Sequence, residues 1–160
     1  MRSIWKPAIG SCHGSGGSLT TSFVPDVGGT YVVRVDVSDG LVSASDSVQV
    51  QAQTVTAYVQ SLLSQMSGSI ASLPNAAFAA TGHRSAMLNA LADLSAAVVA
   101  GDTALALKKV DQLSQRTDGC TYSGTPDASG SGSDWIIDCG VQSQLLTSLN
   151  QVRYRLTPGS

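Results

Sequence analysis

The sequence predicts an α+β chain in which an antiparallel β region precedes a small bundle of four helices. Apolar residues alternate with polar ones between residues 31 and 50, and they recur every three or four residues after residue 54. A polar loop at residues 117–139 carries Cys120 and Cys139, which we expect to form a disulfide that closes the loop. We therefore expect a β unit at residues 1–53 and a helical unit at residues 54–160.

The composition of the chain argues against nucleic-acid partners and membrane spans, and it favours an oxidising compartment. The chain has 12% charged residues and a net charge of -2, so it lacks the basic surface that nucleic acids require, and we expect no nucleic-acid partner. No apolar run reaches the roughly eighteen residues of a membrane span. Three cysteines in a small chain rich in serine and glycine indicate an oxidising compartment. We therefore expect an extracellular or secreted protein whose signal sequence lies outside this chain.

The β region begins with a strand in which every second residue is apolar: Tyr31, Val33, Val35 and Val37. Asp39-Gly40 then supplies a tight turn, because glycine accepts the positive φ that such turns need. The return strand repeats the alternation, with Val48 and Val50 on its apolar face. Asp46 interrupts that face, and we expect it near a bend, where its carboxylate reaches water or a backbone N–H.

Four apolar stripes with helical spacing follow the β region. They cover residues 55–73, 87–99, 105–113 and 141–156. The first stops before Pro74, which cannot continue a helix, and the second ends at Gly101. Asp102 is placed to cap the third. Helices joined by short turns, each with one apolar face, predict a small bundle, with residues 117–139 as a long irregular connection.

Residues 22–52, SFVPDVGGTYVVRVDVSDGLVSASDSVQVQA, resemble the second half of a PKD-type immunoglobulin-like domain. The likeness rests on the PD..G.Y pattern that ends at Tyr31 and on the V.DG hairpin that ends at Gly40, and Trp5 is similar to the tryptophan of the family's central strand. The resemblance implies a truncated antiparallel β-sandwich, because the strands that precede Trp5 in the family lie outside this sequence. Open strand edges recruit other chains, so we expect a homodimer or a swapped assembly through residues 1–53.

Residues 55–156 resemble the FIMAH module, which occurs at the C-terminal ends of large secreted bacterial proteins, often behind PKD repeats. The resemblance rests on GHRSAMLNAL from Gly82, AGDTALALKKV from Ala100 and TDGC…GTPD…DWIIDC from Thr117. The link ASGSGS between Asp127 and Asp134 is longer than in that family. The resemblance implies no defined catalytic activity. It implies a non-catalytic accessory or attachment module of a larger secreted bacterial protein.

The polar loop offers two candidate binding features. Its aspartates could supply oxygen ligands to Ca²⁺: Asp118, Asp127, Asp134 and Asp138. Their spacing matches no EF-hand, and aspartates also serve as turn and cap residues, which is the interpretation we favour. Trp135 could form a binding platform for a polysaccharide or protein ligand, but its isoleucine neighbours favour a role in docking the loop on the bundle.

His83 and Arg84, at the head of the second helix, could bind an anion with help from the helix N-terminus. They could also hydrogen-bond the aspartate-rich loop and hold it in place. We favour this second, structural role, because a polar clasp would explain why both motifs occur in one module.

Cys12 and His13 are adjacent and could bind Zn²⁺, but a catalytic zinc needs three protein ligands. The remaining ligands would come from His83, from an aspartate such as Asp127, or from the same pair in a second subunit. This pair motivates an alternative hypothesis, a metal-dependent hydrolase of activated esters or phosphoesters. A third hypothesis is a carbohydrate-binding or adhesion module that uses Trp135 and the loop. No G-x-S-x-G, H-E-x-x-H, P-loop or dinucleotide motif is present.

Overall fold

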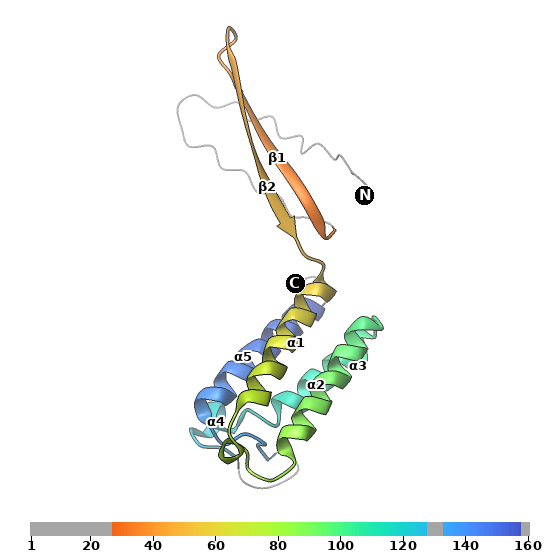
Figure 1. The fold of residues 1–160 in the computed structure, drawn as a ribbon, viewed down its shortest axis with the longest axis vertical. Helices are drawn as coiled ribbons and strands as arrows, with labels where there is room; N and C mark the ends of the chain where they lie inside the picture. Colours follow the sequence, from red (N-terminus) through yellow and green to blue (C-terminus); the bar gives the residue numbers. More distant parts are fainter. Residues whose placement is uncertain (1–26, 128–132, 158–160) are drawn as a thin grey trace. The chain divides into compact units, whose positions relative to one another are not determined.

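A computed structural model describes residues 27–127 and 133–157 of the chain (Figure 1). The chain divides into two compact units, residues 1–53 and residues 54–160. Among the described residues, the first unit contains an antiparallel β-hairpin and the second contains the helices. The α+β class predicted from the two periodicities is therefore confirmed.

The hairpin pairs β1 (Gly29–Ser38) with β2 (Ser43–Ala52). The Asp39-Gly40 turn is confirmed: Gly40 has a φ of 90°, and Oδ1 of Asp39 accepts hydrogen bonds from the backbone N–H of Leu41 at 2.9 Å and of Val42 at 2.7 Å. The bonds from Val42 and then Leu41 lower the pKa of Asp39 below its ordinary value, because they stabilise the ionised carboxylate. The turn sets the register of the two strands.

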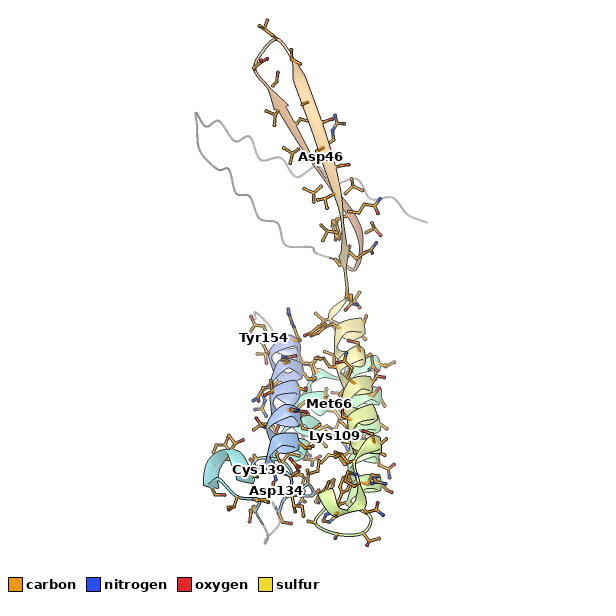
Figure 2. The ribbon with its side chains drawn as sticks, turned by 60° about the vertical axis from the view of Figure 1, so that its left-hand side comes forward. Asp46, Met66, Lys109, Asp134, Cys139 and Tyr154 are labelled. Carbon is orange, nitrogen blue, oxygen red and sulfur yellow. A yellow bond between two sulfur atoms is a disulfide. The ribbon has the colours of Figure 1, made fainter. Side chains whose placement is uncertain are left out.

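That register gathers the predicted apolar residues on one face, because Tyr31 lies opposite Val50 and Val33 lies opposite Val48. Much of this face is exposed to solvent, including 59% of Val48. Asp46 does not lie near a bend as expected. It lies within β2, paired with Val35, and its carboxylate accepts a hydrogen bond from the backbone N–H of Ser47 at 2.8 Å (Figure 2). On an uncovered face the carboxylate stays hydrated, so the strand needs no bend there.

The four predicted helices are present as α1 (Val55–Ser72), α2 (His83–Val99), α3 (Thr103–Ser114) and α5 (Cys139–Leu156). Helix α1 packs against α2 and α5, and α3 packs against the same two helices. The connection at residues 117–139 is less irregular than expected, because it contains the short helix α4 (Gly119–Ser123), which packs on α5. A single 3-10 turn, η1 (Asn75–Ala77), follows α1.

The ends of the helices follow local rules. The side chains of Thr54, Asp102 and Asp138 each accept a hydrogen bond from a backbone N–H in the first turn of α1, α3 and α5. Helix α1 ends where Leu73 turns to an extended conformation before Pro74. These caps place the start of α5 at the cystine.

One apolar cluster forms the core of the helical unit, and residues from the four long helices contribute to it. Three contributors come from the connections: Ala77, Phe78 and Ile136, of which the last two form an isolated antiparallel bridge. The backbone N–H of Ile137 donates to the carbonyl of Ala77 at 2.9 Å, and that of Ala79 donates to the carbonyl of Trp135 at 3.1 Å. The connection after α4 is thereby held against the bundle, with Ile136 fully buried.

Candidate functional site

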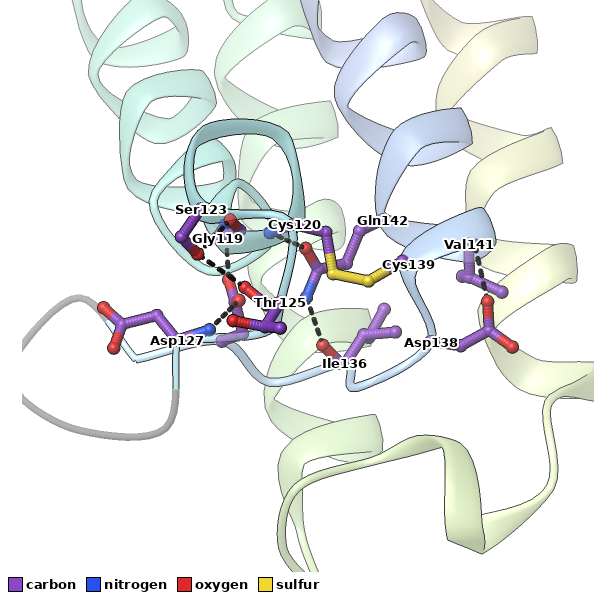
Figure 3. The surroundings of a disulfide bond; sticks show 11 residues. Gly119, Cys120, Ser123, Thr125, Asp127, Ile136, Asp138, Cys139, Val141 and Gln142 are labelled. Atoms are coloured by element: carbon purple, nitrogen blue, oxygen red, sulfur yellow. Dashed lines mark hydrogen bonds between the residues drawn. A yellow bond between two sulfur atoms is a disulfide. The ribbon is translucent and has the colours of Figure 1, made fainter.

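The predicted disulfide between Cys120 and Cys139 is present and joins α4 to the first residue of α5, with Cα atoms 5.4 Å apart (Figure 3). It closes a loop between residues 19 positions apart. This disulfide, α4, residues 124–127 and residues 133–138 form the region that carries most of the candidate site residues.

Asp134 is the central residue of this loop and is 1% exposed. Its Oδ2 accepts a hydrogen bond from the backbone N–H of Asp127 at 2.6 Å, and its Oδ1 accepts one from the backbone N–H of Gly119 at 3.4 Å. The backbone N–H of Asp134 returns a bond to the carbonyl of Asp127 at 2.9 Å. A buried carboxylate that is bonded on both oxygens holds the ends of a loop together. In this structure Asp134 is a structural anchor.

Gly119 is part of the same anchor because it leaves room for Asp134. A Cβ atom built at this position would lie closer than 3.0 Å to Oδ2 of Asp134 and to the backbone nitrogen of Asp127. The backbone of Gly119 is helical, so the lack of a side chain, and not an unusual φ, is what this position requires.

Gln142 is a buried polar residue that the sequence reasoning missed. It is fully buried on α5, where its Oε1 accepts from the backbone N–H of Cys120 at 3.0 Å and its Nε2 donates to the carbonyl of Ile136 at 2.6 Å (Figure 3). The amide of Gln142 therefore links α4 to Ile136, in the connection that precedes α5, next to the disulfide. Position 142 lies three residues before Leu145 on the apolar stripe, which indicates that the side chain is buried but does not identify its two partners.

The aspartates do not assemble a cation site in the described part of the chain, where no group of three or more His, Cys, Asp or Glu side chains could hold a metal ion. Asp138 caps α5, and the carboxylate of Asp127 points away from the disulfide (Figure 3). Partial burial, followed by the negative charges of Asp134 and Asp127, raises the pKa of Asp118 above its ordinary value. Cys12 and His13 lie outside the described residues.

Trp135 is half-buried and stacks with two neighbours. The imidazole of His83 lies 5.6 Å from it between ring centres, at an interplanar angle of 27°, and the guanidinium of Arg116 lies 5.0 Å from the indole. Arg116 also donates to the carbonyl of Ser133 at 3.4 Å. The tryptophan therefore joins the head of α2 to the loop and to the end of α3.

His83 and Arg84 do contact the neighbourhood of the loop, but not through its aspartates as expected. His83 stacks on Trp135, while Arg84 donates to the carbonyl of Leu73 and lies 5.1 Å from the centre of the Phe78 ring. The contact is aromatic because the ring of Trp135, and not a carboxylate, faces the start of α2. Two buried atoms here, Nδ1 of His83 and Nε of Arg84, have no hydrogen-bond partner in the described part of the chain.

None of the described helices is long and apolar enough to cross a membrane. No protein-family model, no curated protein and no solved structure matches the chain.

Proposed function

We propose that the chain is a non-catalytic extracellular attachment module of a larger secreted bacterial protein, with a hairpin unit of PKD type and a helical unit of FIMAH type. The observation that carries this proposal is the role of Asp134. The most conspicuous acidic residue of the loop is buried, and both its oxygens accept backbone N–H groups. Asp134 therefore stabilises the helical unit, and we assign that unit the role of a scaffold whose surface binds the ligand. A disulfide beside it fits an oxidising, extracellular location.

A sedimentation assay tests the attachment role. The purified chain is mixed with insoluble bacterial cell-wall material and with insoluble polysaccharides, and the bound fraction is measured after centrifugation. Hydrolysis of chromogenic esters and phosphoesters is followed in parallel. Sedimentation with at least one surface, without turnover, is the expected result. A chain that stays in the supernatant with every surface would remove the proposal.

We further propose that residues 1–53 pair with a second copy of the chain. A two-stranded hairpin is marginal on its own, and the apolar face of this one is open, with Val35 56% exposed and Val48 59% exposed. Light scattering at micromolar concentration should report a dimer. Val48→Lys should dissociate it, whereas Val32→Lys, on the opposite face and 64% exposed, should not. A monomeric wild-type chain would end this proposal.

The metal-dependent hydrolase remains a second candidate because Nδ1 of His83 is buried and no described residue pairs with it. In this hypothesis that nitrogen is one ligand of a bound cation. Metal analysis of the purified chain, with ester and phosphoester hydrolysis measured before and after chelation, separates the two functions. Chelation-sensitive turnover that His83→Ala abolishes would replace the attachment role.

A carbohydrate-binding role through Trp135 has less support. Its indole is half-buried and already contacts His83 and Arg116, so a sugar would have to displace them. A site for such a ligand is better sought elsewhere on the helical unit.

A further inference from the structure

A groove of about 500 Å³ lies between the start of α1 and the end of α5. Its lining residues are Tyr58, Thr147, Asn150, Gln151, Tyr154 and Arg155. The volume is within the range of small-molecule sites, roughly 300 to 1,000 Å³. Tyr154 lies at the end of the helical unit opposite Cys139 and Asp134 (Figure 2). The rise of α5 separates Cys139 from Tyr154 by about 22 Å, so the groove is distinct from the cystine loop.

Among the residues that the structure describes, Arg155 is the only charged one that lines the groove. Its guanidinium lies 5.2 Å from the ring centre of Tyr58 and 5.7 Å from that of Tyr154, within the roughly 6 Å range of cation–π contacts. No residue in the described ranges forms an ion pair with Arg155, whereas the neighbouring Arg153 is paired with Asp111 at 2.6 Å. The two rings thus position a guanidinium whose charge no described residue neutralises.

The remaining lining side chains are neutral and can form hydrogen bonds. Thr147, Asn150 and Gln151 supply hydroxyl and amide groups that donate and accept, and the hydroxyl of Tyr58 donates to Oε1 of Gln151 at 3.4 Å. Tyr154 is 58% exposed, which leaves much of its side chain accessible to a ligand. Sugars bind to such surfaces, because their C–H faces pack on aromatic rings and their hydroxyls pair with amides.

We propose that this groove binds a carbohydrate that carries a carboxylate, such as a uronic-acid unit of an extracellular polysaccharide. A guanidinium binds a carboxylate through two parallel hydrogen bonds, which selects the acidic sugar over a neutral one. Within residues 27–127 and 133–157, no acidic side chain lines the groove to repel the ligand. One unpaired cation suits isolated carboxylates better than the dense phosphates of a nucleic acid. This inference rests on the proposed attachment role and names its ligand class.

The test compares two soluble trisaccharides, trigalacturonate and the neutral galactotriose, binding to the full chain by calorimetry and by amide chemical shifts. The wild-type chain should prefer the acidic trisaccharide by about tenfold, as expected for a charge-assisted bidentate contact. Arg155→Gln should remove that preference. Arg153→Gln makes the same charge change two positions away, where the arginine is already paired, and should retain it.

Near-ultraviolet circular dichroism checks that each variant folds. If Arg155→Gln does not fold, Arg155→Lys keeps the charge without the bidentate geometry and should lose most of the preference. Equal losses in the variants at 153 and 155, an unchanged preference without Arg155, or no binding by the wild type would overturn the groove assignment. Sedimentation of the wild type with cell-wall material would then still support attachment, so the two failures are distinguishable.

Discussion

Gly119→Ala tests whether the close packing of Asp134 against Gly119 and Asp127, called the cradle below, contributes to the stability of the helical unit. The added Cβ would lie closer than 3.0 Å to Oδ2 of Asp134 and to the backbone nitrogen of Asp127, and 3.1 Å from Cβ of Asp127. The backbone nitrogen cannot move aside cheaply, so the loop must shift and the 2.6 Å bond between Asp127 and Asp134 must lengthen. Overpacking of this kind costs about 1 to 3 kcal/mol, and weakening a bond to a buried carboxylate costs a similar amount. We expect a loss of about 3 kcal/mol in the free energy of unfolding.

Urea denaturation followed by circular dichroism at 222 nm measures this change. The matched control is Gly68→Ala, because Gly68 is exposed within α1 and a Cβ there would meet nothing within 4 Å. That variant should gain up to about 1 kcal/mol from helix propensity. If Gly119→Ala unfolds at the same urea concentration as the wild type, the cradle is not tight and Asp134 is not the anchor.

Three further substitutions address the same end of the bundle. Cys139→Ser should lower the free energy of unfolding by about 3 kcal/mol, the chain-entropy value for a loop of this length, and a reducing agent should do the same to the wild type in urea titrations. Asp118→Asn should raise the free energy of unfolding at neutral pH, because burial and then the Asp134 charge raise the pKa of Asp118 above 3.8. The wild type loses stability as pH rises through that raised pKa. The gain of the variant should therefore vanish below about pH 4, where Asp118 is protonated in the folded and the unfolded chain. His83→Ala should lower the melting temperature and shift the fluorescence of Trp135, at a cost of about 1 kcal/mol for the lost stacking; an unchanged melting temperature would contradict this role.

The sequence was sufficient to predict the elements that depend on local periodicity. Alternation from Tyr31 to Val37 and an Asp39-Gly40 turn determine which hairpin residues face each other, and the structure has that register. Asp102, a capping residue, and Pro74, which cannot continue a helix, predicted helix ends that lie within a few residues of those in the structure. In each case the cause lies within a few residues of the effect.

Features that depend on contacts between distant residues could not be predicted in this way. The expected partners of His83 were the loop aspartates, but Trp135 occupies that position. Gln142 bridges two segments that no short window contains, and helix α4 is too short to show a period. The groove joins Tyr58 to residues more than eighty positions later, so only the packing of α1 on α5 reveals it.

Helix α5 carries contacts that stabilise the loop at its first end and residues of the proposed binding groove at its last end. Its first turns carry the Asp138 cap, the disulfide and the buried Gln142, all of which hold α4 and the loop in place. Its last turns carry Tyr154 and Arg155, which are exposed and contribute nothing to the core. Stability depends on these contacts and on the buried Leu149 and Val152, whereas the exposed side chains of Tyr154 and Arg155 can vary without unfolding the bundle. An attachment module needs this division, because a binding surface must tolerate changes in ligand while its scaffold stays rigid.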